Sequence, residues 1–309
     1  MTLDTPIAFL VFNRPRHTQK TFNSIRAQQP RHLLIVADGP RQDHPTDTQN
    51  CALVREIVSQ VDWPCEVEHN FSEVNLGCKK RVISGLNWVF SRVEQAIILE
   101  DDCLPNADFY SFCSHLLKRY ANDPRVMTIA GCNFQDGIHR GESSYYFSKY
   151  SHIWGWATWR RAWQKNDPSL SFWPSWKNSP EWLTHTPNKF ERQYWSKIFD
   201  RMYRNEIDTW DYPWTANIWH HGGLTAIPNV NLVSNIGFGP DGTHTVAYKD
   251  QDGQPTSPLG VLIHPYDVRQ DCIADQYTYD HLLGGLNQQW PWFLLRLPRR
   301  IIKKLRQYW

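Results

Sequence analysis

The stretch that decides the fold is Gln95-Ala-Ile-Ile-Leu-Glu-Asp-Asp102, a short apolar run that ends in three consecutive acids. A nearly continuous apolar run of this length predicts a strand buried on both faces. Because side chains alternate along a strand, Glu100 and Asp102 are expected on one side and Asp101 on the other. One or two carboxylates are enough to hold a divalent cation that also binds a diphosphate. The motif therefore suggests a metal site, and the alternative is a solvated turn.

Strand-like and helical patterns alternate through the whole first half of the chain. The predicted elements are strands at Ile7–Phe12, His32–Ala37, Cys65–Asn70 and Gln95–Leu99, and helices over residues 16–29, 47–61 and 79–91. Such alternation predicts an α/β fold with a mostly parallel central sheet flanked by helices. In sheets of this kind the ligand binds in the crevice beyond the carboxyl ends of the strands.

Polar residues follow the predicted strands at that edge. Arg14 follows the first strand, and its planar guanidinium can reach a phosphate. Asp38 follows the second strand and could accept hydrogen bonds from a base or ribose. Taken alone, each is as well explained as an ordinary surface residue, so their value lies in sharing one edge with the acids.

A basic helix start precedes the acidic strand. Asn75-Leu-Gly77 is followed by Lys79-Lys-Arg81, with Lys80 in the predicted first turn. Glycine permits a close backbone approach, and a helix N-terminus with basic side chains binds phosphate groups well. The segment therefore fits a diphosphate, and a solvated basic turn remains the alternative.

The bulk composition is that of a globular protein. The 309 residues are 41% hydrophobic and 21% charged. Seven scattered cysteines without a C-x-x-C pair predict reduced thiols rather than a disulfide framework or a zinc site. The N-terminus has neither the pattern of a signal peptide nor that of a membrane span, which predicts a cytoplasmic protein.

The net charge of +2 is distributed unevenly. Residues 288–309 contain six Lys and Arg and no acid, so the remaining chain is mildly acidic, which argues against nucleic acid as a substrate. The tail itself alternates apolar and basic positions in a helical pattern. This predicts peripheral contact with the inner face of the cell membrane, or a terminal helix docked on the protein.

The second half of the chain is rich in tryptophan. Eight of the 16 Trp lie between Trp154 and Trp195. An indole can fill a core or cover the apolar face of a sugar. We expect an extension packed against the sheet, followed by a loop at Asp250–Pro258. His220-His221 is interpreted only as the end of a helix.

Two further features of this half could carry chemistry. The glycine-rich Gly237–Thr245 could close over a ligand, with His244 touching a diphosphate or completing a metal shell. Asp211, in Trp-Asp-Tyr-Pro-Trp, could be a catalytic carboxylate or the N-cap of a helix.

The order of these motifs resembles the GT-A glycosyltransferases of the family 2 superfamily. It is most similar to the branch with the β-1,2-N-acetylglucosaminyltransferase of N-glycan branching. The likeness extends in collinear order over residues 6–245. Beyond the motifs above, it includes Leu104-Pro-Asn-Ala-Asp-Phe109, Ile153-Trp-Gly-Trp156, Trp210-Asp211-x-x-Trp214 and residues 227–238.

The resemblance implies a role for each matching residue. Arg14 and Asp38 would contact the nucleotide, with uracil as the base. Glu100 and Asp101 would hold the donor sugar and ribose. Asp102 would ligate Mn²⁺ or Mg²⁺.

Asp211 matches the general base of an inverting transfer. The relative has two acids in this motif and this chain has one, so Asp208 is the reserve candidate.

The predicted function is therefore transfer of a sugar from a nucleotide-diphosphate donor to a saccharide or lipid-linked acceptor in surface glycan or glycolipid synthesis. The resemblance to the GT-A enzymes implies that the donor is a UDP-sugar. Residues 1–125 would bind the donor, residues 126–250 the acceptor, and residues 251–309 would form the loop and tail. The alternatives are a glycoside hydrolase, which also pairs carboxylates with Trp-lined subsites, and a non-catalytic carbohydrate-binding protein.

Overall fold

A single large sheet forms the centre of the protein. The computed structural model describes residues 2–237 and 253–288. The strands are β1 (Ile7–Val11), β2 (His32–Ala37), β3 (Glu66–Phe71), β4 (Gln95–Glu100), β5 (Cys103–Pro105), β6 (Val126–Ala130), β7 (Tyr145–Ser148), β8 (Trp156–Trp159), β9 (Leu224–Pro228) and β10 (Val233–Asn235). Eight of them form one sheet in the order β3-β2-β1-β4-β8-β6-β9-β7, and β5 pairs with β10 separately.

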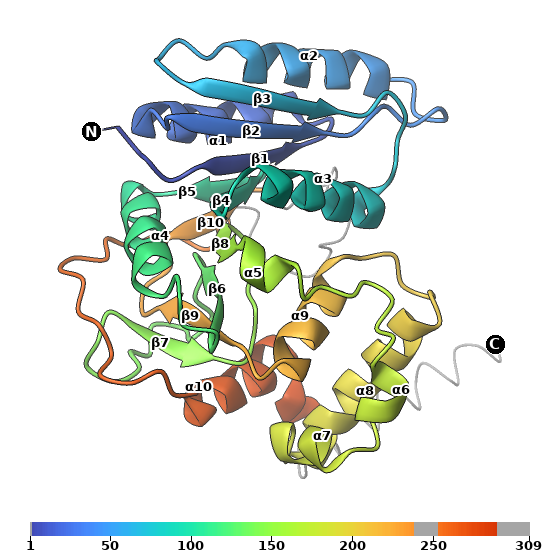
Figure 1. Ribbon diagram of the computed structural model, residues 1–309, viewed down its shortest axis with the longest axis vertical. Coiled ribbons are helices and arrows are strands. Elements are labelled where there is room, and N and C mark those ends of the chain that lie inside the picture. The colour runs from blue at the N-terminus through green and yellow to red at the C-terminus, as the bar shows by residue number, and fades with distance from the viewer. Residues whose placement is uncertain (1, 238–252, 289–309) are drawn as a thin grey trace, which may run out of the picture.

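The first half of that sheet is parallel throughout. Strands β3, β2, β1 and β4 run in one direction, as do β6 and β9, whereas β8 and β7 run against their neighbours. Helices flank the sheet on both faces (Figure 1). The predicted α/β class, with a mostly parallel central sheet flanked by helices, is confirmed.

The first three helices begin and end close to the predicted positions, and the fourth was not predicted. They are α1 (Pro15–Gln28), α2 (Asp47–Ser59), α3 (Cys78–Arg92) and α4 (Ala107–Arg119). Proline at the start of α1 supplies a preset backbone angle where no N–H is needed. Asn106 caps α4 by accepting from the Phe109 N–H. Local sequence therefore fixes these helix ends.

Two hydrophobic cores lie on the two faces of the sheet. Alternate residues of β1 supply both, since Ile7 and Phe9 belong to one core and Ala8 and Leu10 to the other. Helices α1, α2 and α4 cover the first face, and α3 covers the second. A strand buried on both faces needs apolar residues at every position, which explains its continuous apolar run.

The second half adds strands β6 to β9 to the same sheet and a group of helices to the α3 face. These are α5 (Arg160–Trp163), α6 (Trp173–Trp176), α7 (Pro180–His185), α8 (Lys189–Tyr203) and α9 (Asp211–His220). Most of the indoles of this half are buried between them, and the rings of Trp156 and Trp210 stack with centroids 5.6 Å apart. Core packing is therefore their main role. Helix α9 ends at His220, as predicted.

The chain after the loop contains structure that the sequence did not predict. Residues 253–288 include α10 (Cys272–Tyr277), a π-helical turn at Thr278–Leu282 and a 3-10 turn at Gly285–Gln288. Asp271 caps α10 by accepting from the N–H groups of Ile273 and Ala274. The helix is too short to produce a periodic signal. The predicted basic tail lies outside the described residues from 289 onward.

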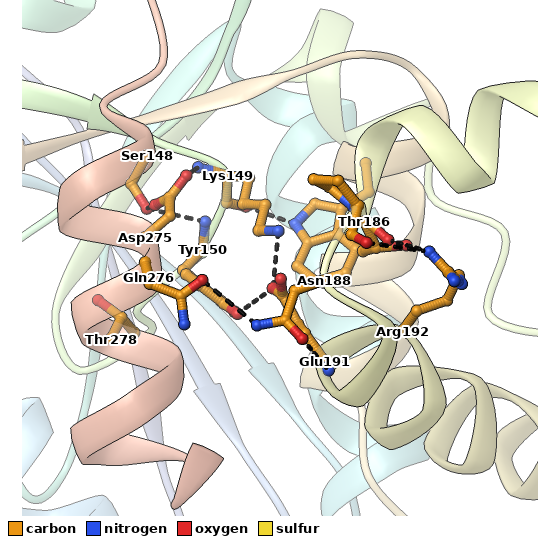
Figure 2. A network of polar contacts seen from close by, with 12 residues as sticks. Ser148, Lys149, Tyr150, Thr186, Asn188, Glu191, Arg192, Asp275, Gln276 and Thr278 are labelled. Carbon is orange, nitrogen blue, oxygen red and sulfur yellow. Dashed lines mark hydrogen bonds and ion pairs between the residues drawn. The ribbon is translucent and has the colours of Figure 1, made fainter. Parts of the chain in front are cut away.

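A buried polar network joins these late elements to the sheet (Figure 2). Lys149 Nζ lies 2.6 Å from Glu191 Oε1, and both side chains are almost fully buried. The Tyr150 hydroxyl donates to the same Glu191 carboxylate. Asp275 on α10 accepts from the Ser148 hydroxyl and the Lys149 N–H. The network thus ties α8 and α10 to the end of β7.

The described part of the chain also answers two questions about its cysteines and its helices. All seven cysteines are free, as predicted. No helix within residues 2–237 and 253–288 has the length and hydropathy needed to cross a membrane.

The buried ion pair makes a stability prediction. Lys149→Met leaves the Glu191 carboxylate buried without its cation, and loss of one partner of such a pair costs about 3–5 kcal/mol. Urea unfolding should show this loss in the free energy of unfolding. Lys149→Met/Glu191→Gln should recover much of it, and Lys197→Met, at an exposed position of α8, should change little. Equal stability of the single variant and the wild type would contradict the assignment.

Candidate functional site

The carboxyl ends of β1, β2 and β4 lie level at one edge of the sheet. In the register, Leu10 of β1 is opposite Glu100, and Val11 is opposite Ala37. Residues that directly follow these strands are therefore brought together. This is the edge at which the sequence predicted a ligand site.

Arg14 and the acids after β4 are in direct contact. Arg14 Nη2 donates to Asp101, and Arg14 Nη1 lies 3.0 Å from Asp102 Oδ2. The Asp101 carboxylate is almost fully buried and also accepts from the Phe12 N–H at 3.3 Å. Asp101 is thus buried and anchors Arg14. Strand β4 ends at Glu100, and Asp101 and Asp102 form a turn in which one guanidinium contacts both carboxylates, so the strand alternation expected for these acids does not extend to them. The sugar or ribose contact expected for Asp101 stays a prediction.

Asp38 organises the turn before α3. Its carboxylate accepts from the N–H groups of Gly39, Leu76 and Gly77, and from the Asn75 side-chain amide, at 2.9–3.2 Å. The residue is only 5% exposed, and its oxygens are occupied by these donors. Removal from water raises its pKa despite the hydrogen bonds that oppose the shift. A direct contact of Asp38 with a nucleotide stays a prediction, whereas its role in the turn is plain.

The start of α3 faces the same edge. Gly77 precedes it with a φ of 77°, a left-handed conformation that glycine adopts without strain. Arg81 is buried and donates to the Ala37 carbonyl and to Asn70, so it fixes the helix to the ends of β2 and β3. Lys80 is exposed in the first turn. Of these two basic residues, Lys80 is the one available to a ligand.

Asp211 is the first residue of α9 rather than its cap. The N-cap position belongs to Trp210, whose side chain makes no capping hydrogen bond. Asp211 is half-buried and accepts from the Thr209 hydroxyl. The N-cap interpretation of Asp211 is therefore not what the structure shows. The Thr209 contact was not predicted, because no motif in the sequence indicated it.

Electrostatic effects reveal that these acids converge. Removal from water, and then the charges of Glu100, Asp211, Asp208 and Asp102, raise the pKa of Cys78 to about 12. Cys78 is exposed at the start of α3, and Glu100, Asp102, Asp208 and Asp211 lie near enough to act on the pKa of its thiol. Cys78 was not predicted to have a role, because nothing in the sequence indicated what its thiol would face.

The pKa of Glu100 also indicates that several acids lie close together. Removal from water is the largest cause that raises its pKa to about 8, followed by the charges of Asp102 and Asp101, while Arg14 lowers it and Asp211 raises it. Glu100 thus senses both the acids next to it in the sequence and the carboxylate that begins α9. Asp208 also lies at this edge, since its Oδ2 is 3.8 Å from an ideal Cβ built on Gly77.

The glycine-rich segment begins against Arg14 and Asp102. An ideal Cβ on Gly237 would lie 2.3 Å from Asp102 Oδ2 and 2.9 Å from Arg14 Nη1, so a side chain there would displace this ion pair. The Ile236 N–H donates to the Asp102 carbonyl at 2.8 Å, which fixes this approach. His244 lies outside the described residues.

The acids at this edge fit a hard divalent cation. Glu100 and Asp102 offer carboxylate oxygens, the ligands that Mg²⁺ and Mn²⁺ prefer, beside a half-open edge where phosphate oxygens and water could complete the shell. A second group, His32 with Glu66 and Glu68, has ligand atoms within 4.8 Å of one another. It lies at the opposite edge of the sheet, and Glu68 already pairs with Arg92 at 3.2 Å.

The turn held by Asp38 makes a second prediction. Asp38→Asn replaces one acceptor oxygen with a donor that faces N–H groups, so the free energy of unfolding should fall by about 1–3 kcal/mol. Limited proteolysis should also cut within residues 73–78 more rapidly. Asp43→Asn, an exposed acid in the preceding loop, is the matched control. If both variants unfold at the same denaturant concentration, the Asp38 contacts do not hold the turn.

Comparisons with known proteins find similarity only at the level of solved structures. No family matches the chain. No curated protein matches it either. Among the solved structures, the mannosyltransferase PcManGT from Pyrobaculum calidifontis in complex with GDP-Man and Mn²⁺ is 13% identical, with 52% of this chain and 46% of that one covered and a TM-score of 0.36.

Two other similar structures are nucleotide-handling enzymes. A CMP:2-keto-3-deoxy-manno-octonic acid synthetase complexed with CTP is 11% identical, with 72% of this chain and 89% of that one covered and a TM-score of 0.38. A UDP-glucose pyrophosphorylase complexed with UDP-glucose is 9% identical, with 53% and 79% covered and a TM-score of 0.32. The chain aligns with less than half of the mannosyltransferase. At such identities and TM-scores, these likenesses assign this chain neither an activity nor a substrate.

Proposed function

We propose that the protein is a metal-dependent glycosyltransferase of the GT-A type, which transfers a sugar from a nucleotide-diphosphate donor to an acceptor hydroxyl. The observation that carries the proposal is that Arg14 and Asp102 pair at the carboxyl ends of β1 and β4, while Asp208, three residues before Asp211, lies beside Gly77 at the start of α3. The acids at the end of β4 can serve the donor side of the site, and Asp211 can serve the acceptor side. A basic helix start lies between them.

The donor side would consist of residues at the ends of the parallel strands. The N–H groups at the start of α3, together with exposed Lys80, favour a diphosphate. Asp102, with Glu100 beside it, would hold Mn²⁺ or Mg²⁺. When bound, the ion neutralises the charge that develops on the departing diphosphate. Asp38 would act through the turn that it holds, and the base is proposed to be uracil.

Asp211 would act as the general base on the acceptor side. One of its oxygens accepts from the Thr209 hydroxyl, which leaves the other to take the proton of an acceptor hydroxyl as that oxygen attacks the sugar. Trp210 stacks on Trp156, so a rigid aromatic core fixes the residue that precedes Asp211. Attack from the face opposite the diphosphate would invert the anomeric carbon.

The acceptor and the cellular location stay predictions. The basic tail that would bring the enzyme to an anionic membrane surface lies outside the described residues. A lipid-linked acceptor in surface glycan or glycolipid synthesis, and a cytoplasmic location, rest on the sequence alone.

The acids of the site make an activity prediction. Asp211→Asn should lower kcat for nucleotide release from UDP- or GDP-sugars about 10²–10⁴-fold, because general-base catalysis contributes on that order. Asp102→Ala should abolish the nucleotide release that Mn²⁺ supports, because the variant lacks the proposed metal ligand. Release is measured with a coupled nucleotide assay in the presence of mixed saccharide acceptors.

Asp208→Asn is the matched control for Asp211, because Asp208 is an exposed acid on the same loop. It should retain most of the wild-type kcat. If Asp208→Asn is the inactive variant, the base is Asp208. If no sugar nucleotide is cleaved by the wild type with either metal, the proposed function is wrong.

The raised pKa of Glu100 predicts that metal affinity depends on pH. With a pKa of about 8, its carboxyl is mostly protonated at pH 7 in the metal-free protein, and a bound cation must displace that proton. Affinity for Mn²⁺ should therefore rise between pH 7 and pH 8.5, with release of a proton on binding. Isothermal titration calorimetry in buffers of different ionisation enthalpy measures this proton. Glu100→Gln should remove the proton release in that range. Proton release unchanged in Glu100→Gln would assign it to another group.

A further inference from the structure

Arg14 holds the same carboxylate that the proposed metal would use. Its Nη1 is 3.0 Å from Asp102 Oδ2, while its Nη2 donates to Asp101. Among the described residues, the other Asp102 oxygen has only the weak contact of the Cys103 thiol at 3.6 Å. In the described part of the chain, Arg14 is the cation that forms an ion pair with Asp102.

The two arms of Arg14 differ in their surroundings. The Asp101 side chain is 3% exposed and accepts from the Phe12 N–H as well, so this arm is anchored in the interior. The Asp102 side chain is 16% exposed, so the second arm lies at the open edge. The guanidinium can therefore keep its inner contact while the outer contact changes partner.

We propose that Arg14 is an internal counter-ion that holds Asp102 in the nucleotide-free protein and passes to the diphosphate when the donor binds. This rests on the proposed function, because it takes Asp102 as the metal ligand. Arg14 then couples the two binding events: the metal binds weakly alone and tightly with a nucleoside diphosphate.

Charge explains the coupling. A divalent cation on Asp102 beside Arg14 puts two positive groups on one carboxylate, and they repel at this short range. A diphosphate brings negative oxygens that both cations can share, and the planar fork of an arginine matches phosphate well. By linkage, the factor by which the nucleotide raises metal affinity equals the factor by which the metal raises nucleotide affinity.

Gly237 limits where the outer arm can go. Its backbone packs so closely that a Cβ there would meet Asp102 Oδ2 and Arg14 Nη1 at less than 3 Å. The guanidinium is thus confined on this side. Its free direction is toward the open edge, where the start of α3 would receive a diphosphate.

The test is a binding cycle read by the electron paramagnetic resonance of free Mn²⁺, which does not depend on turnover. Mn²⁺ affinity is measured with and without UDP or GDP, with the Mn²⁺–nucleotide complex in solution subtracted. In the wild type, the diphosphate should raise Mn²⁺ affinity on the order of tenfold or more. In Arg14→Gln, the affinity without nucleotide should rise several-fold, and the coupling should fall toward one.

Two further variants separate the inference from a general loss of structure. Arg14→Gln leaves Asp101 buried without a cation, so Arg14→Gln/Asp101→Asn is measured beside it and should give the same rise in nucleotide-free Mn²⁺ affinity. Arg16→Gln removes an exposed charge from the first turn of α1 and should behave like the wild type.

The outcomes distinguish this inference from the proposed function. If the wild type binds Mn²⁺ together with nucleotide but both Arg14 variants keep the wild-type coupling, the counter-ion role is wrong and the proposed function stands. A weaker nucleotide-free affinity in both variants also overturns it, because Arg14 would then assist the metal. If the wild type binds Mn²⁺ neither alone nor with nucleotide, the metal assignment itself fails.

Discussion

A carboxylate that is removed from water must find donors or a cation, and this constraint shapes the carboxyl edge of the sheet. Asp101 meets it with Arg14 and the Phe12 N–H, and Asp38 meets it with the donors of the turn before α3. These two buried acids connect the ends of β1, β2 and β4 and fix the start of α3. Glu100 and Asp102 remain at this edge. The buried charges of Asp101 and Asp38 beneath them already have partners.

The position of Asp211 on the other side of the site depends on packing that is remote from this edge. Helix α9, which begins with Asp211, is held by the stacking of Trp210 on Trp156 and by the Trp219 indole, which donates to the Lys149 carbonyl. Lys149 itself forms the buried pair with Glu191 on α8. The position of the carboxylate therefore depends on a chain of aromatic and ionic contacts through the second hydrophobic core. A change at Lys149 is expected to act on the site only through α9.

Much of the first half was predictable because its signals are local. Continuous apolar runs gave β1, β2 and β4 within a residue or two, and strand ends placed Arg14 beside the acids. The sequence could not show that Asp38 has its oxygens filled by backbone donors, because two of those N–H groups, from Leu76 and Gly77, lie 38 and 39 residues further along the chain. The buried Lys149–Glu191 pair and α10 were missed for a similar reason. Both depend on tertiary contacts that leave no periodic pattern.

The charges at the edge explain why these remote contacts matter to function. Glu100, Asp102, Asp208 and Asp211 all act on the pKa of Cys78, so these four acids lie near one helix start. Repulsion between these acids would separate the end of β4 from the start of α9 if both were free to move. Arg14 holds the acids at the strand ends, and the aromatic core behind α9 holds Asp211. The acids therefore cannot move apart, and their repulsion is relieved when a cation binds. A site that binds a cation and a diphosphate together needs such a held excess of negative charge, because the cation then arrives at carboxylates that cannot relax away from it.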